Sequence, residues 1–448
     1  MVLKNLHRLS KLFQPVSVVP KNAEVKRHDI TSKSQRLMLE LGIIKQASPG
    51  CFHFLPLGVK SLEKLTSLVD EEMKKIGGQK IIFPTLTNAK LWEKTGRLET
   101  VSSELFQIKD RHDQSYILSP THEEAASNLL ASLSPISYKQ LPLKLYQITS
   151  KYRDEMKPRF GLMRGKQFLM KDMYSFDTDI KTAKHTYDEI CKSYDKIFRK
   201  IGIDFIKVVG SSGHMGGELS HEYQYKADVG EDKILTCTKC NYSANTEISG
   251  EEKCPNCGNN SVEIHLGIEV GHTFLLGEKY SKPLNATFLS KNGKLEVLQM
   301  GSYGLGLSRI MAAAIEVMSS EQEIRWPDIL SPFSVIILPP KSGSKEEIHI
   351  QNSGLVESLY EKIETICNLK DNVLIDDRTN FTIGRRLLEA KRNGYPFIVA
   401  LGKKILENPF LYEITNLKTN ETIFLSENDL LNYLRNHLSS SSCDPDNK

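Results

Sequence analysis

The apolar positions between residues 58 and 84 repeat at the spacing of an α-helix. Gly77 and Gly78 would end this helix, and residues 80–83 would follow it as a strand. By itself this unit is an ordinary core helix and strand, and its pattern indicates no function. The predicted buried face carries Val59, Leu62, Leu65, Val69, Met73 and Ile76.

A second pattern predicts a β-hairpin with strands at 145–150 and 166–176. Like charges crowded on one loop repel each other, so we expect the cationic loop between these strands to bind an anion. Arg153 ends the first strand, where its guanidinium can bind a phosphate or carboxylate through two parallel hydrogen bonds. Phe168 can offer a flat face to a purine, although a strand phenylalanine is more commonly part of a core. The loop cations are Lys157, Arg159 and Arg164.

A glycine-rich segment, residues 301–306, lies between a predicted strand at 295–300 and a predicted helix at 307–317. Glycines let a ligand approach backbone N–H groups closely, and the start of a helix favours negative charge. Arg309 in the first helical turn opposes the helix dipole, which makes sense if an anion binds there. The alternative is a tight turn without a ligand.

The last third of the chain alternates strands and helices, which predicts a small α/β domain with a mostly parallel sheet. The predicted strands are 334–338, 372–376 and 396–401, and the predicted helices are 355–367 and 383–393.

Before this region strands and helices are segregated, which favours an antiparallel sheet. Pro327 and Pro332 break the pattern after a long helix. We therefore expect one domain at 31–328 and a second at 332–438.

Composition and charge exclude several classes of protein. A net charge of +4 over 448 residues is too small to bind a polyanion through a bulk field, so nucleic-acid contacts must be local. Charged residues interrupt every apolar run before the roughly 20 residues that a membrane-spanning helix needs. No membrane is therefore expected among the partners.

The segment 1–30 forms a basic arm, with Lys4, Arg8, Lys11 and Lys21 and no acidic residue before Glu24. On a helix its apolar and basic side chains would gather on different sides, a pattern typical of a transit peptide. The alternative is a frayed basic N-terminus. At the other end, residues 439–448 are polar and without periodicity, so we expect a disordered tail.

Four of the eight cysteines form two close pairs, Cys237 with Cys240 and Cys254 with Cys257. This spacing is that of a knuckle holding one tetrahedral zinc ion. Two disulfides and four free thiols are the alternatives. Eight cysteines in 448 residues are too few for a secreted, disulfide-rich protein, so we favour a reducing compartment.

Two shorter runs, residues 119–124 and 267–274, carry further candidate ligands. Thr121 and Glu123 can hold a small ammonium-bearing molecule through a hydroxyl and a negative charge. The same Thr-His-Glu-Glu run can also begin a helix with an acidic first turn. His272 follows a glycine, and by itself it is more commonly structural than catalytic.

In combination these segments resemble the class II aminoacyl-tRNA synthetases. Residues 153–172, which contain Arg-Asp-Glu, Pro-Arg-Phe-Gly-Leu-Met-Arg and Met-Lys-Asp, are similar to motif 2 of that family. Residues 301–309 are similar to motif 3 and residues 56–84 to motif 1. The runs 121–124 and 267–274 resemble the prolyl enzymes of the bacterial kind rather than the threonyl, seryl, histidyl or glycyl enzymes.

The resemblance spans about residues 35–435 and implies a fold, a reaction and ligands. The fold would be α+β, with a catalytic antiparallel sheet and helices followed by a C-terminal α/β anticodon-binding domain. The reaction would join proline to tRNA(Pro) through a prolyl-adenylate, with ATP and Mg²⁺. Motif 1 would form a homodimer.

The resemblance also implies roles for individual residues. Arg153 and Arg309 would be the catalytic residues, the first on the α-phosphate and the prolyl carboxylate, the second on the γ-phosphate. Glu155 and Phe168 would bind the adenine, and Arg164 would add to the ATP site. The proline pocket would contain Thr121, Glu123, Arg153, His272 and Ser302.

This sequence departs from the bacterial pattern between the cysteine pairs. Related enzymes carry a large editing domain there, whereas only the short segment 241–253 separates Cys240 from Cys254 in this chain. We therefore expect no editing of alanyl-tRNA in cis. The shortened form with a basic arm resembles the mitochondrial enzymes, which implies the mitochondrial matrix, or the cytoplasm if the arm is not an import signal.

Basic residues of the second domain are suited to the phosphates and base edges of a single-stranded anticodon. A solvated helix face is the alternative interpretation. The candidates for tRNA binding are Arg378, Arg385, Arg386 and Lys403.

Two other functions are compatible with parts of this pattern. A synthetase-like accessory protein that has lost catalysis would be expected to lack Arg153 or Arg309, and both are present. A threonine-specific enzyme would need zinc ligands in its amino-acid pocket, whereas the paired cysteines are expected in a separate knuckle.

Overall fold

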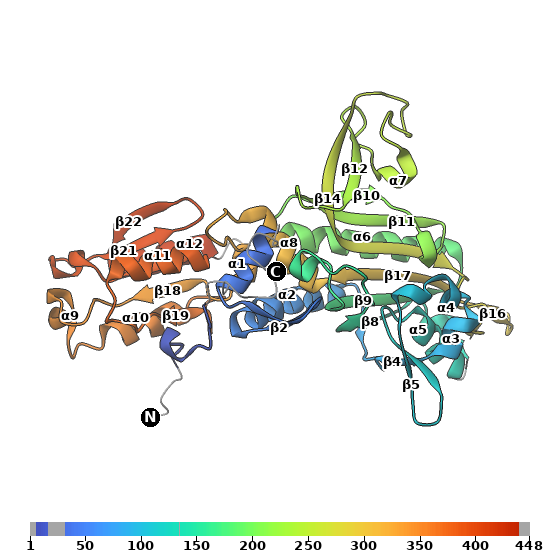
Figure 1. The fold of residues 1–448 in the computed structure, drawn as a ribbon, viewed down its shortest axis with the longest axis horizontal. Coiled ribbons are helices and arrows are strands. Elements are labelled where there is room, and N and C mark those ends of the chain that lie inside the picture. Colours follow the sequence, from blue (N-terminus) through green and yellow to red (C-terminus); the bar gives the residue numbers. More distant parts are fainter. Residues whose placement is uncertain (1–5, 17–31, 134, 439–448) are drawn as a thin grey trace.

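The computed structural model describes residues 6–16, 32–133 and 135–438. These residues form two parts, one built on a nine-stranded sheet and the other on a five-stranded sheet (Figure 1). Most of the basic arm and the predicted tail at 439–448 lie outside the described residues. Among the described residues, no helix is both long and apolar enough to cross a membrane.

The nine-stranded sheet forms the core of the larger part, in the order β11-β10-β13-β12-β14-β17-β9-β8-β3. Neighbouring strands pair antiparallel except β10 with β13 and β3 with β8, which confirms the predicted antiparallel sheet. Its strands are β3 (Gln79–Lys80), β8 (Leu143–Tyr152), β9 (Gln167–Asp177), β10 (Ile206–Val209), β11 (Leu219–Lys226), β12 (Asp232–Cys237), β13 (Ser243–Asn245), β14 (Val262–Gly277) and β17 (Gln299–Gly306).

The hairpin predicted around residues 145–176 is confirmed. β8 and β9 pair antiparallel from Leu143 opposite Phe176 to Tyr152 opposite Gln167. The first strand is longer at both ends than the prediction because its pairing with β9 continues past the predicted range.

The glycine-rich segment, predicted as a junction between a strand and a helix, is itself part of strand β17. β17 lies between β14 and β9, and α8 (Leu307–Met318) follows it directly. A Cβ atom on Gly301 would lie 2.8 Å from Oγ of Ser175 and 2.1 Å from the hydroxyl of Tyr303, so only glycine fits there. Glycine is a weak strand former, and hydrogen bonds from strands on both sides compensate for this. The residues predicted as the preceding strand contain β16 (Leu295–Val297) and the first two residues of β17, Gln299 and Met300.

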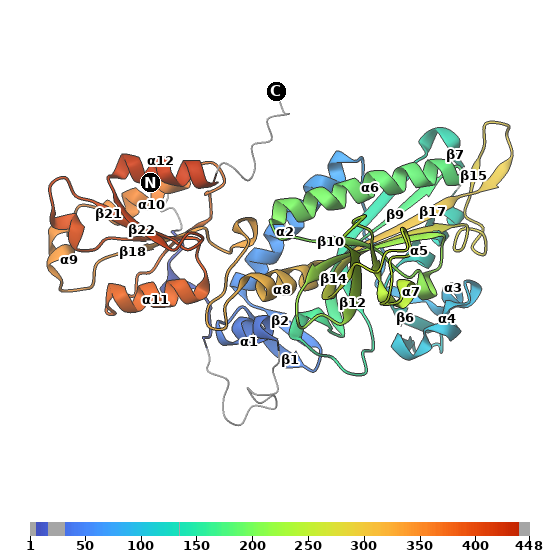
Figure 2. The same cartoon turned by 90° about the horizontal axis from the view of Figure 1, so that it is seen from above.

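Helices α2 (Pro56–Lys75), α6 (Ile180–Ile201) and α8 pack together, and α6 and α8 cover the sheet (Figure 2). The carboxylate of Asp179 accepts backbone N–H groups of the first turn of α6, and Gly202, with φ of 82°, ends that helix. The layer shields one face of the sheet from water.

Helix α2 confirms the predicted helix, but the strand after it is shorter than predicted. Leu65, Val69 and Met73 are buried as expected, whereas Val59 is 38% exposed. β3 contains two residues instead of residues 80–83, because its pairing with β8 ends at Lys80.

Smaller elements surround the large sheet. They comprise a β1–β2 hairpin, a sheet in the order β4-β6-β5 and a sheet in the order β16-β15-β7. Their bounds, with those of the adjoining helices, are α1 (Lys33–Glu40), β1 (Ile44–Ser48), β2 (Cys51–Phe54), β4 (Leu86–Asn88), α3 (Ala89–Lys94), α4 (Arg97–Thr100), β5 (Phe106–Lys109), β6 (Ser115–Leu118), α5 (Glu123–Ser132), β7 (Ile136–Ser137), α7 (Thr246–Ser249) and β15 (Thr287–Leu289).

The C-terminal part confirms the predicted alternation of strands and helices. In its sheet, ordered β19-β18-β20-β21-β22, the three predicted strands run parallel and two further strands add antiparallel. Its elements are β18 (Val335–Leu338), α9 (Lys345–Ile350), α10 (Leu355–Glu364), β19 (Val373–Ile375), α11 (Ile383–Asn393), β20 (Phe397–Ala400), β21 (Tyr412–Asn416), β22 (Glu421–Leu425) and α12 (Glu427–Leu438).

Residues 6–16 of the arm do not form the amphipathic helix that their spacing suggests. Arg8 forms a parallel bridge with Ile375 at the edge of the five-stranded sheet, and the arm has a single turn of 3-10 helix. Ser10 donates two hydrogen bonds to the carboxylate of Asp377, from its N–H (2.9 Å) and its hydroxyl (2.6 Å). A helix this short is marginal in water, so the contacts with the sheet determine the conformation.

The same arm connects the two parts of the molecule. The side-chain amide of Gln14 donates to the backbone oxygen of Leu41 in the larger part (2.9 Å) and to Oδ1 of Asn393 in the smaller part (2.7 Å). Nearby, Arg392 pairs with the buried carboxylate of Glu40 at 2.7 Å. The two parts are therefore joined by polar contacts as well as by the chain.

Candidate active site

A cavity of about 330 Å³, which we call the central cavity, lies against the β8–β9 hairpin, β14 and β17. The structure brings to it every residue that the sequence suggests for ATP or proline binding. These residues are Thr121, Glu123, Arg153, Glu155, Arg164, Phe168, His272, Ser302 and Arg309.

A second cavity of about 270 Å³, the side cavity, shares one end of the central cavity. Most residues proposed for ATP line both cavities, whereas the residues proposed only for proline line just the central cavity. Arg153, Glu155, Arg164 and Arg309 line both cavities. Thr121, Glu123, His272 and Ser302 line only the central one, as does Phe168.

Arg153 and Arg309 place two positive charges in this shared end. Burial and the charge of Arg309 lower the pKa of Arg153 from its ordinary value. Nε of Arg309 donates to the backbone oxygen of Met163 (2.8 Å), and the guanidinium of Arg153 lies 5.2 Å from the ring centre of Phe168. Two close guanidinium groups form a site for a multiply charged anion.

The cationic loop between β8 and β9 is less repulsive than its sequence suggests. Nε of Arg164 donates to Glu155 (2.8 Å), and its terminal nitrogen donates to Glu231 (2.7 Å). Arg159 also pairs with Glu231. Carboxylates therefore neutralise part of the loop's charge, and an anionic ligand would compete with them for Arg164.

Glu123 forms the acidic end of the central cavity. Its fully buried carboxylate accepts hydrogen bonds from the hydroxyls of Thr121 (2.7 Å) and Ser302 (2.8 Å). Arg97 donates to it at 3.2 Å and also pairs with the neighbouring Glu124 at 3.1 Å. These groups hold one carboxylate where it can receive a protonated primary or secondary amine.

A buried polar network supports the turn that carries Thr121 and Glu123. The hydroxyl of Tyr174 accepts the backbone N–H of His122 (2.7 Å) and donates to Asp172 (2.7 Å). Burial alone would raise the pKa of Asp172, but the charge of Lys151, 2.7 Å away, and the bond with His122 lower it. The network is thus anchored on an ionised carboxylate.

His272 is held on two sides in the cavity wall. Nδ1 lies 2.8 Å from Glu269, and Nε2 lies 2.7 Å from the hydroxyl of Ser220. Its ring stacks on Phe274 with ring centres 3.9 Å apart. Although burial opposes ionisation of Glu269, the bond with His272 and nearby Arg309 lower its pKa to about 2. Both His272 contacts fix the orientation of the ring.

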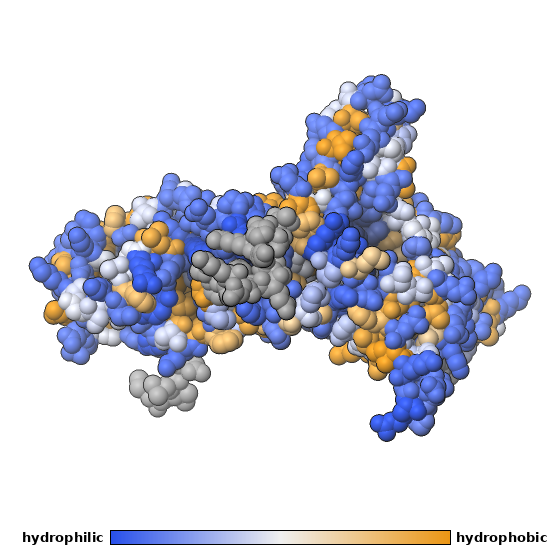
Figure 3. Space-filling view, in the orientation of Figure 1, coloured by the Kyte–Doolittle hydropathy of each residue, from blue (hydrophilic) through white to orange (hydrophobic). Residues whose placement is uncertain are grey.

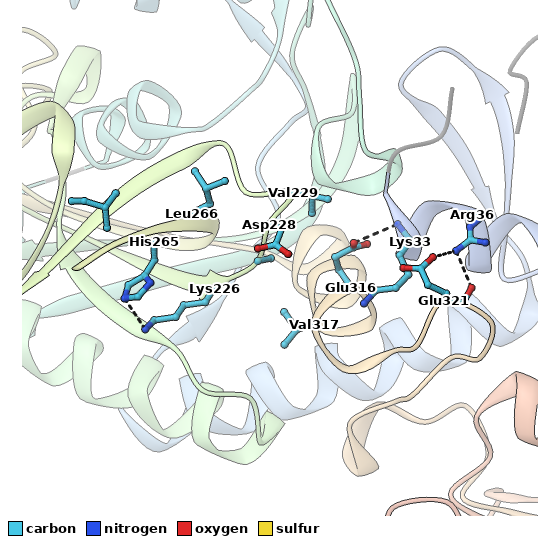
Figure 4. A pocket seen from close by; sticks show the side chains of 12 residues that line it. Lys33, Arg36, Lys226, Asp228, Val229, His265, Leu266, Glu316, Val317 and Glu321 are labelled. Atoms are coloured by element: carbon cyan, nitrogen blue, oxygen red, sulfur yellow. Dashed lines mark hydrogen bonds and ion pairs between the residues drawn. The ribbon is translucent and has the colours of Figure 1, made fainter. Parts of the chain in front are cut away.

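A wider and more open hollow of about 890 Å³ lies between α1, α8 and the start of β14 (Figure 4). Most of its charged side chains have partners within the protein. Glu316 accepts the backbone N–H of Ser34 (2.6 Å), Arg36 pairs with Glu321, and Lys226 lies 3.1 Å from the ring of His265. It contains none of the predicted ligand residues, and we assign it no role.

The candidate tRNA-binding residues lie in different surroundings. Arg378 pairs with Asp376 and Glu389, both at 2.8 Å, and Glu389 also contacts the exposed Arg385 at 3.2 Å. Lys403 is exposed.

Arg386 was expected on the basic surface, but it is fully buried. Its guanidinium donates to the backbone oxygens of Asp376 (2.9 Å) and Pro339 (2.6 Å). It therefore supports the fold of the domain and is not available to an anticodon.

The four paired cysteines lie outside both cavities, at the end of β12 and in the segment before β14. Their sulfur atoms all lie within 4.8 Å of one another.

Two family models match this chain. Residues 106–318 match the model described as "tRNA synthetase class II core domain (G, H, P, S and T)", and residues 334–437 match the model described as "Anticodon binding domain".

Proteins of similar sequence have consistent names. The chain is 47% identical over 432 residues to the rat protein "Probable proline--tRNA ligase, mitochondrial", covering 95% of this chain and 90% of that protein. The fission yeast protein of the same name is 38% identical, with 89% and 92% covered. The "Proline--tRNA ligase" of Ehrlichia chaffeensis is 37% identical, with 91% and 96% covered.

Solved structures show the same fold. The prolyl-tRNA synthetase of Giardia lamblia in complex with prolyl-adenylate has a TM-score of 0.75 at 17% identity, with 92% of this chain and 80% of that chain covered. The enzyme of Cryptosporidium parvum complexed with halofuginone and AMPPNP has a TM-score of 0.73 at 20% identity, with 91% and 77% covered.

Proposed function

This chain belongs to the proline–tRNA ligases of the class II aminoacyl-tRNA synthetases, and we propose that the residues of the central cavity carry out that reaction. The enzyme joins L-proline to tRNA(Pro) in two steps through a prolyl-adenylate, using ATP. The observation that supports the residue assignment is the cavity itself, which has two guanidinium groups at one end and a buried carboxylate at the other.

Proline fits this polarity as a zwitterion. Its charged imino group lies at Glu123, with the hydroxyls of Thr121 and Ser302 completing the hydrogen bonds, and its carboxylate faces Arg153. His272 forms a wall of the pocket through its fixed ring. This orientation directs the carboxylate of the amino acid toward the nucleotide.

ATP occupies the shared end of the two cavities. Arg153 holds the α-phosphate, Arg309 the γ-phosphate, and Phe168 and Glu155 contact the adenine. Arg164 turns from its carboxylate partners to the phosphates when ATP binds. The supporting observation is that these side chains line the cavity from the β8–β9 hairpin and from the helix that follows β17.

In the first step a carboxylate oxygen of proline attacks the α-phosphorus of ATP, a phosphorus–oxygen bond forms, and pyrophosphate leaves with the electron pair of the broken bond. The substrate is itself the nucleophile, so the side chains align it and neutralise charge that spreads over the phosphates. In the second step a ribose hydroxyl of the terminal tRNA adenosine attacks the prolyl carbonyl, and AMP leaves. No protein base is assigned to either step.

Magnesium fits the site because carboxylates line the end of the cavities where phosphates would bind. Glu269 and Asp232 would provide oxygen ligands of the kind that Mg²⁺ prefers. Bound with ATP, the ion reduces repulsion between phosphate oxygens. The four cysteines at 237–257 are outside these cavities, so zinc there would take no part in either chemical step.

The chain divides into a catalytic domain at 31–328 and an anticodon-binding domain at 332–438. Arg385 and Lys403 contact tRNA(Pro) on the second domain, and Arg378 joins them if its carboxylate partners yield. Exposure of Arg385 and Lys403 supports this assignment.

A homodimer forms through residues 56–84 of the catalytic domain. Its support is Ile82, a large apolar side chain that is 79% exposed in the single chain directly after β3. Covering this side chain with a partner would remove its apolar area from water, which is favourable.

The enzyme works in mitochondrial translation, in the matrix. Two kinds of observation support this location: relatives from mammals and fission yeast are named mitochondrial, and the N-terminal arm at 1–30 is basic.

Amino-acid-dependent exchange of pyrophosphate into ATP, measured with each of the twenty amino acids, tests the function. Proline should support rapid exchange, and Arg153→Ala should reduce it at least 100-fold. Arg199→Ala, an exposed residue of α6, is the matched control and should keep the wild-type rate. Dependence on threonine, or no exchange by folded wild-type protein, would overturn the assignment.

A further inference from the structure

The paired cysteines form one compact cluster rather than two separate pairs. Sγ of Cys237 lies 3.7 Å from Sγ of Cys257, and Sγ of Cys240 lies 3.6 Å from Sγ of Cys254. Each short distance therefore links one pair to the other. We propose that this cluster binds one Zn²⁺ ion through all four sulfur atoms, as a structural site separate from the active site.

The distances distinguish zinc from disulfides. A disulfide requires sulfur atoms about 2.05 Å apart, and all four thiols are free in this structure. A tetrahedral zinc site with Zn–S bonds of about 2.3 Å places neighbouring sulfur atoms about 3.8 Å apart. The two short distances match that edge, and all four sulfur atoms lie within 4.8 Å of one another, close enough to surround one ion.

The two Cys-x-x-Cys turns also have the same backbone geometry. In each turn, the N–H of the first cysteine donates to the carbonyl five residues later, at 2.9 Å for Cys237 and 2.8 Å for Cys254. The carbonyl of the first cysteine accepts the N–H four residues later, at 3.0 and 2.8 Å. That fourth residue, Asn241 or Gly258, has a positive φ of 56° or 70°. Two equivalent turns facing each other form a complete four-thiolate site.

A further donor is directed at one of the sulfur atoms. The side-chain amide of Asn256, in the second turn, lies 3.5 Å from Sγ of Cys240 in the first turn. An N–H group directed at sulfur favours the thiolate that binds metal, and such outer contacts orient metal ligands. It therefore supports a metal centre over four neutral thiols.

The position in the fold explains why a metal is needed. The cluster lies on a projection formed by β12, α7 and the start of β14. This projection stands out from the molecule and has a largely hydrophilic surface (Figures 1 and 3). Residues 250–261 contain no helix or strand, and Cys254 is the one buried residue among them. Without an apolar core, this segment depends on the metal for a fixed structure.

Elemental analysis of the full-length protein, purified without chelator, tests the proposal. We expect one zinc per chain in the wild type and at least a tenfold loss in Cys254→Ser. Cys367→Ser is the matched control, because Cys367 is an exposed, isolated free thiol, and it should keep its zinc. If Cys254→Ser fails to fold, Cys257→Ser removes an exposed ligand and should show the same loss.

A second measurement follows the segment itself. Chelation of the wild-type protein should increase the rate of trypsin cleavage at the exposed Lys253 at least tenfold, and added zinc should restore protection. Absence of metal from wild type, iron in place of zinc, oxidised cysteine pairs, or full zinc in both cysteine variants would each overturn the proposal. These outcomes are independent of pyrophosphate exchange, so they leave the proposed function to its own test.

Discussion

The guanidinium groups of Arg153 and Arg309 occupy the same end of the central cavity. The pKa of Arg153 is lowered first by burial and then by the charge of Arg309. Two like charges held this close repel each other until an anion binds between them. This relationship connects the β8–β9 hairpin with the helix after β17, and a bound polyphosphate would relieve the repulsion.

Removing Arg309 should weaken ATP binding more than proline binding. A hydrogen bond to a charged group contributes about 1.5–3 kcal/mol, so Arg309→Ala should raise KM for ATP about 10- to 150-fold. KM for proline should change much less. Steady-state pyrophosphate exchange measures both constants, with Arg199→Ala as the control. An unchanged KM for ATP would contradict the role of Arg309.

Tyr174→Phe should affect proline selectively, because the Tyr174 hydroxyl joins the turn at His122 to Asp172. We expect KM for proline to rise about two- to thirteen-fold, the range of one hydrogen bond of about 0.5–1.5 kcal/mol, with little change in kcat or in KM for ATP. Tyr225→Phe is the matched control, since the described part of the chain supplies no hydrogen-bond partner for that buried hydroxyl. Equal effects of both variants would show that the hydroxyl of Tyr174 has no positioning role.

Asp177 should make the protein less stable as the pH rises. Burial raises its pKa from 3.8 to about 6, although Thr186 donates to it at 2.7 Å. Between these values the folded state keeps a proton that the unfolded state releases, so the free energy of unfolding decreases with pH.

Asp177→Asn should remove this contribution, up to about 3 kcal/mol between pH 4 and pH 6. Urea unfolding at several pH values measures the difference between variant and wild type. Glu361→Gln, at an exposed position, should keep the wild-type slope. A variant curve parallel to the wild-type curve over this interval would rule out the titration of Asp177.

Deleting residues 1–16 should destabilise the protein, because residues 6–16 contact both parts of it. Loss of these contacts should lower Tm by several degrees, at about 2–4 °C per kcal/mol. A chain lacking only residues 1–5 is the control and should melt like the wild type. If the longer deletion melts at the wild-type temperature, the arm makes no net contribution. A presequence cleaved after residue 16 would cause the same loss.

The protein should leave mischarged alanyl-tRNA(Pro) intact. The segment 241–253 between Cys240 and Cys254 forms β13, α7 and short connections, which leaves no room for a hydrolytic domain. Incubation of purified enzyme with alanyl-tRNA(Pro) should release alanine at the rate of buffer alone. Hydrolysis well above that rate would disprove the prediction.

The hairpin that carries Arg153 and Phe168 could be predicted because its information is local. Alternating strand residues flank a loop rich in cations, and both features are adjacent in the chain. The strand β17 could not be predicted in the same way. Its glycines disfavour a strand by propensity, whereas pairing with β14 and β9 on both sides forms the strand, and Ser175 and Tyr303 leave room only for glycine at position 301.

The pairing of Glu269 with His272 depends on an irregularity that sequence patterns do not contain. Residues three apart lie on opposite faces of a regular strand. In β14, however, Gly271 pairs with Tyr223 and Glu269 with the next residue of β11, so Val270 is an extra, bulged residue. The bulge turns Glu269 and His272 to the same side, where they meet in the cavity.

Arg97 was missed for a different reason. It lies on α4, a helix of four residues, and nothing near it in the chain indicates a ligand. Only the tertiary fold brings its guanidinium to Glu123 and Glu124.

The bridge between Arg8 and Ile375 has a consequence for synthesis on the ribosome. The chain emerges N-terminus first, so the arm is exposed while most of the remaining chain is translated. Leu9 and Leu12, which pack against the core in the finished protein, have no complete surface to cover until then. One of the first segments to be made therefore takes its final conformation only after the C-terminal sheet that it contacts is complete.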